Sequence, residues 1–185
     1  LTAVDVAGLI GDLSSLEKLY ELLQSEYPAV RNLTALAVGR INNDSSIEKL
    51  KPLLNDTFGM VRKSAIVSIG KLKTADTSII NILFNNLNDT YYYVRFSAVE
   101  ALQNFDTTII VPLIFNKIKF AENEKLLLYY LRILANFRVI DAYQSAEIRK
   151  LFETATDELI AEYSLRILTN STPSEISELY INDFR

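Results

Sequence analysis

Charged side chains recur at fixed intervals in this sequence, and three arginines form the most regular series. Arg31, Arg62 and Arg95 each follow a valine, and they lie 31 and 33 residues apart. Asp56 and Asp89 each stand six residues before one of these arginines. A guanidinium binds a carboxylate or a phosphate through two parallel hydrogen bonds. The series therefore fits either a row of cations for an anionic partner or a set of ion pairs, and the fixed Asp-to-Arg interval favours ion pairs.

The residue types that most often carry catalysis are missing. The sequence has no histidine and no cysteine, which removes the usual general base near neutral pH and the thiol nucleophile. Only carboxylates would remain as zinc ligands, and they select zinc poorly. The five glycines form neither a phosphate-binding loop nor a dinucleotide-binding turn. We therefore expect no catalytic residue, no cofactor and no metal, and a protein that is not an enzyme.

The overall charge and the apolar pattern limit the partners. The formal net charge is −4, whereas binding a phosphate backbone requires an excess of lysine and arginine on one face. No apolar run is long enough to span a membrane, and no signal peptide is evident. We expect no nucleic-acid partner, no membrane contact by this segment, and a location in the cytoplasm or in the soluble part of a membrane-anchored protein.

The elements that position the arginines are repeated helices. In the segment 61–72, small and apolar residues recur at helical spacing and place a narrow stripe on one helix face; they are Val61, Ala65, Ser68, Ile69 and Leu72. The same frame begins again at Val30 and Val94, and more weakly at Leu126 and Ile160. A period of this length that persists along the chain indicates stacked repeats, because no single helix pair can bury its own apolar face.

The copies resemble HEAT-like repeats, in particular the short variety of the phycobilisome lyases. The resemblance rests on the Asp-x5-Arg spacing at Asp56 to Arg62 and at Asp89 to Arg95, and on the Val-Arg-x-x-Ala frame that begins at Val61. It implies an all-α, right-handed α-solenoid, or superhelix, of about five HEAT-like helix pairs. Residues 1–185 would form a single domain. Because the sequence opens at Leu1 inside a repeat, we expect it to be the C-terminal part of a longer chain.

Several local features refine this prediction. Ser14 or Ser15 is expected to cap the helix that follows, and Pro52 is expected to kink a first helix. One or two of the three tyrosines in the segment 91–93 should be core or hydrophobic-staple residues, although an exposed triplet could anchor a partner. The segment 172–185 is expected to form a last helix that covers the end of the stack.

The second helix of each repeat carries the candidate binding surface, because second helices line the concave side of HEAT-type stacks. Positions two, six and ten after the first residue of each frame point away from the buried stripe. They present cations, amides and a few apolar groups, which suit an acidic protein or peptide, although an ordinary solvated face fits the same pattern. The residues of this predicted second-helix face are Asn32, Leu36, Arg40, Lys63, Val67, Lys71, Phe96, Glu100, Arg132, Asn136 and Arg166. The other residues at these positions are Asn104, Leu128, Glu162 and Asn170. The residues expected to act structurally between repeats are Asp56, Arg62, Asp89 and Arg95.

These observations predict a non-catalytic scaffold or adaptor module that binds a protein or peptide on its concave face. Two alternatives stay open: the resemblance implies a chaperone for chromophore attachment like the phycobilin lyases, and the module could regulate an enzyme or membrane domain fused upstream. HEAT-like DNA glycosylases bind DNA on a basic face and HEAT-repeat hydroxylases hold iron through histidine. The acidic balance argues against the first of these classes, and the missing histidine argues against the second.

Overall fold

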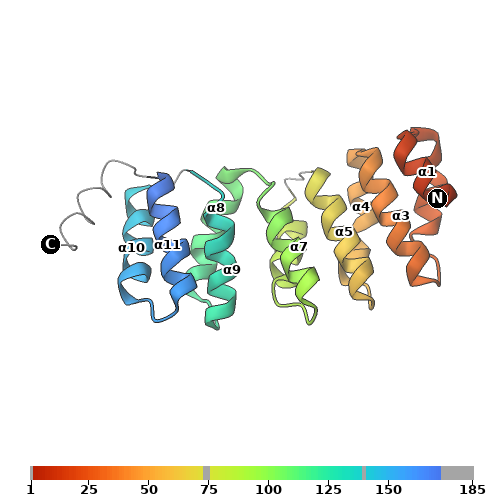
Figure 1. Ribbon diagram of the computed structural model, residues 1–185. Helices are drawn as coiled ribbons and strands as arrows, with labels where there is room; N and C mark the ends of the chain where they lie inside the picture. Colours follow the sequence, from red (N-terminus) through yellow and green to blue (C-terminus); the bar gives the residue numbers. More distant parts are fainter. Residues whose placement is uncertain (1, 73–75, 139–140, 172–185) are drawn as a thin grey trace. The chain divides into compact units, whose positions relative to one another are not determined.

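The fold is entirely helical over the part of the chain that the structure describes. A computed structural model describes residues 2–72, 76–138 and 141–171 of the 185. These residues form eleven α-helices and three short 3-10 helices, with no β-strand (Figure 1). None of the described helices has the length and apolar character needed to cross a membrane. The predicted all-α architecture is confirmed.

The chain divides into two compact units, Leu1–Asp106 and Thr107–Arg185, called unit 1 and unit 2 below. Unit 1 has two layers of helices. The layer of second helices contains α1 (Ala3–Ile10), α3 (Pro28–Ile41), α5 (Gly59–Leu72) and α7 (Tyr92–Leu102), which pack side by side in that order (Figure 1).

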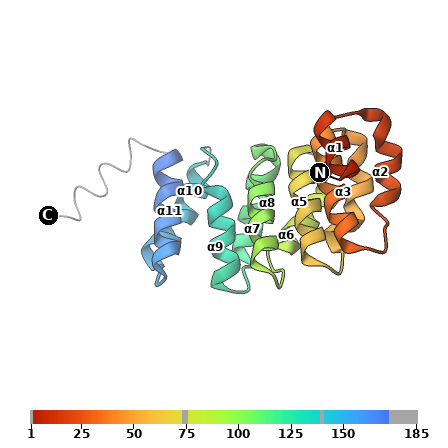
Figure 2. The same ribbon diagram turned by 45° about the vertical axis from the view of Figure 1, so that its right-hand side comes forward.

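The other layer of unit 1 consists of the first helices, each packed on a second helix. Figure 2 brings one of them, α2, into view beside α3. This layer contains α2 (Leu16–Leu22), α4 (Ile47–Leu50) with the 3-10 helix η3 (Lys51–Asn55), and α6 (Thr77–Asn86). Two further 3-10 helices, η1 (Leu13–Ser15) and η2 (Asp44–Ser46), lead into α2 and α4.

Unit 2 repeats the arrangement with two helix pairs. Its helices are α8 (Thr107–Lys119), α9 (Glu124–Leu134), α10 (Ala142–Thr154) and α11 (Glu158–Ser171). α8 packs on α9, α9 on α11, and α10 on α11. The last helix that the sequence predicts, in the segment 172–185, lies outside the described residues.

Short polar side chains cap several of these helices. The Asp76 carboxylate accepts the Ser78 N–H at 2.7 Å before α6, and the Asn123 side chain accepts the Leu126 N–H at 3.0 Å before α9. Ser15 occupies the N-cap position of α2, as predicted, but its side chain makes no capping hydrogen bond; a 3-10 turn precedes α2, and Asp12 caps that turn. Its carboxylate accepts the Ser14 N–H at 2.9 Å.

The proline kink takes the form of a change in helix type. α4 ends at Leu50, and the chain continues as the 3-10 helix η3 with Pro52 in its first turn. Proline has no N–H for the bond four residues back, and its ring crowds that carbonyl. The tighter 3-10 winding continues the first helix without that bond.

Small residues set the close approach of neighbouring second helices. The predicted stripe of α5 is buried along its whole length. A Cβ atom added to Gly39 would lie 2.8 Å from the Ser68 Cα atom in the next repeat. Gly8 faces Ala37, and Gly70 faces Ala101, in the same way. Glycine at these positions therefore allows helix backbones to touch.

Candidate functional site

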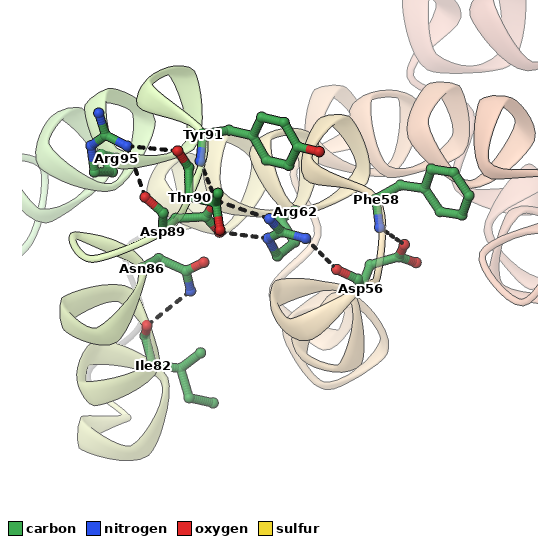
Figure 3. Close-up of polar contacts among 9 residues, drawn as sticks. All are labelled: Asp56, Phe58, Arg62, Ile82, Asn86, Asp89, Thr90, Tyr91 and Arg95. Atoms are coloured by element: carbon green, nitrogen blue, oxygen red, sulfur yellow. Dashed lines mark hydrogen bonds and ion pairs between the residues drawn. The ribbon is translucent and has the colours of Figure 1, made fainter.

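The arginine series joins successive repeats of unit 1. Arg62 Nε donates to Asp89 Oδ2 at 2.6 Å, and Arg62 Nη2 donates to Asp89 Oδ1 at 2.9 Å. Its remaining Nη1 donates to the Asp56 main-chain carbonyl at 2.6 Å (Figure 3). One guanidinium therefore binds the main chain at the start of its own helix and the carboxylate of the next repeat.

Arg31 repeats this geometry one repeat earlier. Its Nε and Nη2 donate to the two carboxylate oxygens of Asp56 at 2.7 and 3.0 Å, and its Nη1 donates to the Ser25 carbonyl at 2.7 Å. Arg95 donates to the Asp89 and Thr90 carbonyls at 2.8 and 3.0 Å. Each aspartate thus bonds the arginine of the repeat before it, while the arginine six residues later bonds its main chain.

Asp56 and Asp89 lie in a partly buried setting that keeps them charged. Burial acts to raise the pKa of Asp89, but hydrogen bonds from Arg62 and from the Tyr91 N–H outweigh it and lower the pKa below its usual value. Burial likewise opposes hydrogen bonds from Arg31 and the Phe58 N–H at Asp56, and its pKa is also lowered. The two carboxylates form ion pairs with Arg31 and Arg62 of the preceding repeats, so these residues link successive repeats of unit 1.

The predicted second-helix face is open in unit 1. None of its eight residues there is buried, and Arg40, Lys71, Phe96 and Glu100 are exposed. Two of them make identified polar contacts: the Asn32 Oδ1 atom accepts the Ser64 hydroxyl at 2.5 Å, and Arg40 Nη1 lies 3.9 Å from Asp5 Oδ1. The face combines three cations with one acid, although the chain as a whole is acidic.

Unit 2 carries the three remaining residues of the prediction. Asn136 and Arg166 are exposed, and Arg132 on α9 is partly exposed. Arg166 lies on α11, and Asn136 follows the end of α9. The second helices α9 and α11 pack side by side within unit 2, and α11 also carries the exposed acid Glu162.

The structure also shows an aromatic surface that the sequence did not predict in full. Tyr91 and Tyr92 are 47% and 65% exposed, and Tyr93 is only partly buried, so none of the three tyrosines belongs to the core. Phe58 and Tyr27 stand at the position equivalent to Tyr91 in earlier repeats and are also exposed. The signal was available in the matching triplets Asp56-Thr57-Phe58 and Asp89-Thr90-Tyr91.

A metal centre has no counterpart in the described part of the chain. Within residues 2–72, 76–138 and 141–171, no three His, Cys, Asp or Glu side chains come together as ligands.

The stacked helix pairs, their small-residue contacts and the arginine–aspartate series define an α-solenoid repeat protein. The family model for HEAT repeats matches residues 1–70, and the model for a single HEAT repeat matches residues 79–108. The chain is a HEAT-like repeat protein.

Solved structures of engineered repeat proteins share the fold. One engineered protein has a TM-score of 0.58 and 18% identity, with 93% of this chain and 91% of that chain covered. A designed armadillo repeat protein in complex with the peptide (KR)4 has a TM-score of 0.57 and 19% identity, with 91% of each chain covered. No curated protein matches the sequence.

Proposed function

We propose that this chain is a non-catalytic scaffold module that binds an acidic protein segment on the second-helix face of unit 1. The observation that carries the proposal is the charge of that face. In unit 1, Arg40, Lys63 and Lys71 are cations, and Glu100 is the one acid among the eight predicted residues. A basic face on an acidic protein raises the local concentration of an anionic partner and speeds its encounter.

The packing of the repeats supports this division of roles. The arginines that face the next repeat are paired with Asp56 and Asp89, so their charge is already satisfied. Lys63, in contrast, directly follows Arg62 but lies on the face that points away from the buried stripe. The designed armadillo neighbour that was solved with a (KR)4 peptide supports peptide binding as a use of this fold.

Charge reversal tests the proposal directly. The variant Arg40→Glu, Lys63→Glu, Lys71→Glu should lose binding of a fluorescent glutamate-rich peptide, measured by fluorescence anisotropy at low salt. We expect the affinity for the peptide to fall by at least about tenfold. Each cation on this face speeds the encounter with an anionic peptide and complements its charge in the complex. The unfolding midpoint should stay close to that of the parent protein, since the altered side chains are exposed or partly exposed.

A matched control separates local charge from total charge. Lys18→Glu, Lys49→Glu, Lys150→Glu changes the net charge by the same amount at exposed positions on the first helices α2, α4 and α10. This control should retain binding. Equal loss in both triple variants, or no loss in either, would reject the second-helix face as the binding surface.

A further inference from the structure

Two apolar side chains, Leu36 and Val67, interrupt the polar second-helix face of unit 1. They stand 31 residues apart at equivalent positions of α3 and α5, which pack side by side (Figure 1). Both are partly exposed rather than buried. These two side chains, called the apolar pair below, therefore lie on one surface that a partner can reach.

The packing of the repeats does not require an apolar residue at this position. Asp5 on α1 stands 31 residues before Leu36, and Glu100 on α7 stands 33 residues after Val67. The same repeat position thus carries an acid on the helix at either side, and neither acid is buried. Leu36 and Val67 are therefore not explained by the contacts that all copies share.

Three cations lie one helical turn from the apolar pair. On α5, Lys63 stands four residues before Val67 and Lys71 four residues after it. An α-helix rises about 1.5 Å per residue, so each lysine lies about 6 Å from Val67 along the helix axis. On α3, Arg40 stands four residues after Leu36. Residues four apart share a helix face, so cations and apolar pair form one surface.

The cations of this surface can exchange partners easily. Arg40 Nη1 lies 3.9 Å from Asp5 Oδ1, and both side chains are partly exposed. A pair of this length in water contributes little to stability, so a carboxylate from a partner can replace Asp5 at low cost. Lys63 and Lys71 are partly exposed and exposed, respectively.

A purely acidic segment would use the cations of this surface but leave the apolar pair in water. Protein interfaces commonly place an apolar centre inside a polar rim, and the residues that carry most of the binding energy cluster at the centre. We propose that the acidic partner carries a large aliphatic side chain between its acids. This side chain contacts the apolar pair, and the flanking carboxylates pair with Lys63, Lys71 and Arg40. The proposal rests on the proposed function, because it names the partner of the same face.

Two acidic peptides of equal charge test this proposal. One contains Glu-Glu-Leu-Glu-Glu between Gly-Ser flanks, and serine replaces the leucine in the other. In fluorescence anisotropy with the full chain, the leucine peptide should bind at least about fivefold more tightly, because its side chain leaves water on binding. The variant Leu36→Gln, Val67→Thr should lose this preference and keep its affinity for the serine peptide. Both positions are partly exposed, so the variant should remain folded.

Two controls separate the apolar contact from general stickiness. Leu159→Gln removes a 47% exposed apolar side chain on α11 of unit 2 and should leave the preference for leucine unchanged. A neutral peptide with Gln-Gln-Leu-Gln-Gln at its centre should bind the parent protein at least about tenfold more weakly than the acidic leucine peptide, because it has no charge for the cations.

The outcomes distinguish this proposal from the proposed function. Equal binding of the two acidic peptides to the parent protein, or a preference for leucine that survives in the Leu36→Gln, Val67→Thr variant, would overturn the apolar contact. If that equal binding is lost on charge reversal of Arg40, Lys63 and Lys71, the proposed function stands alone. Absence of binding by both acidic peptides would contradict both proposals.

Discussion

Asp89 serves two repeats of the stack with one short side chain. Its Oδ1 atom accepts the Tyr91 N–H at 2.8 Å, which satisfies a free donor where α7 begins. Both of its carboxylate oxygens also accept hydrogen bonds from Arg62 of the repeat before. Asparagine could keep the first role but would lack the charge needed for the second.

The lowered pKa values of Asp56 and Asp89 predict a specific loss of stability in acid. An aspartate in the unfolded chain takes up a proton near pH 3.9, whereas these two remain charged to lower pH in the folded protein. The unfolded state therefore binds more protons in this window, and the free energy of unfolding rises with pH there. The stabilisation is complete above about pH 5 and is lost as pH falls through the lowered pKa values.

Urea unfolding at several pH values measures this effect. Asp89→Asn should lower the free energy of unfolding by about 2 kcal/mol at pH 7, because Arg62 is left largely buried without its partner. The same variant should weaken the dependence of stability on pH between about pH 5 and pH 2. Asp44→Asn removes an exposed carboxylate as a control; an equal change in that variant would contradict the assigned role of Asp89.

Sequence reasoning reached this ion pair only in part. The six-residue interval from Asp56 to Arg62 indicates that the arginines have acidic partners. It does not indicate which acid pairs with which arginine, because that depends on the repeat that packs alongside. In the folded chain, Arg62 uses the Asp56 carbonyl and takes its carboxylate partner from Asp89, 27 residues later.

The second helices depend on glycine for their close packing. Gly39 of α3 faces Ser68 of α5, and the Ser68 hydroxyl donates to the Ala35 carbonyl at 2.8 Å across the same contact. A hydrogen bond between a side chain and a neighbouring helix backbone requires the backbones to approach closely. The position of Gly39 therefore reflects packing rather than backbone flexibility.

Gly39→Ala should reverse the usual effect of replacing glycine in a helix. Alanine normally stabilises a helix by up to about 1 kcal/mol relative to glycine. Here the new Cβ atom would lie 2.8 Å from Ser68 Cα, so we expect a net loss of about 1–3 kcal/mol from overpacking. Thermal unfolding checks this, with Asn81→Ala on the exposed side of α6 as the control for helix propensity. A stabilised Gly39→Ala protein would show that the contact can relax.

Helix positions were easier to predict than the details of their ends. The recurrence of apolar residues predicts α5 because that spacing is a property of the helix itself. Ser15 is the N-cap of α2, as expected, but the 3-10 turn Leu13–Ser15 before it gives the side-chain acceptor role to Asp12. Pro52 was expected to kink a helix, and the first helix changes to 3-10 winding at that point.

The whole chain combines local contacts between repeats with surfaces that packing leaves open. Each repeat of unit 1 contacts the next through small residues and ion pairs, as expected for a solenoid. The apolar period predicts this order of helices, because every copy carries it. The chain divides after Asp106, and Phe58, Tyr91 and Tyr93 line a groove in unit 1. Both features depend on how neighbouring repeats approach one another. The spacing of apolar residues along the sequence does not predict that approach.

Arg62 and Lys63 provide the most direct test of this separation between structural and recognition residues. They are adjacent on α5, but Arg62 bonds Asp89 of the next repeat, whereas Lys63 lies on the second-helix face. In parallel urea unfolding at pH 7, Arg62→Ala should lower the free energy of unfolding by about 2–3 kcal/mol, since it leaves Asp89 without its partner. Lys63→Ala should change that free energy by less than about 0.5 kcal/mol. Equal losses in the two variants, or a larger loss for Lys63→Ala, would contradict the account.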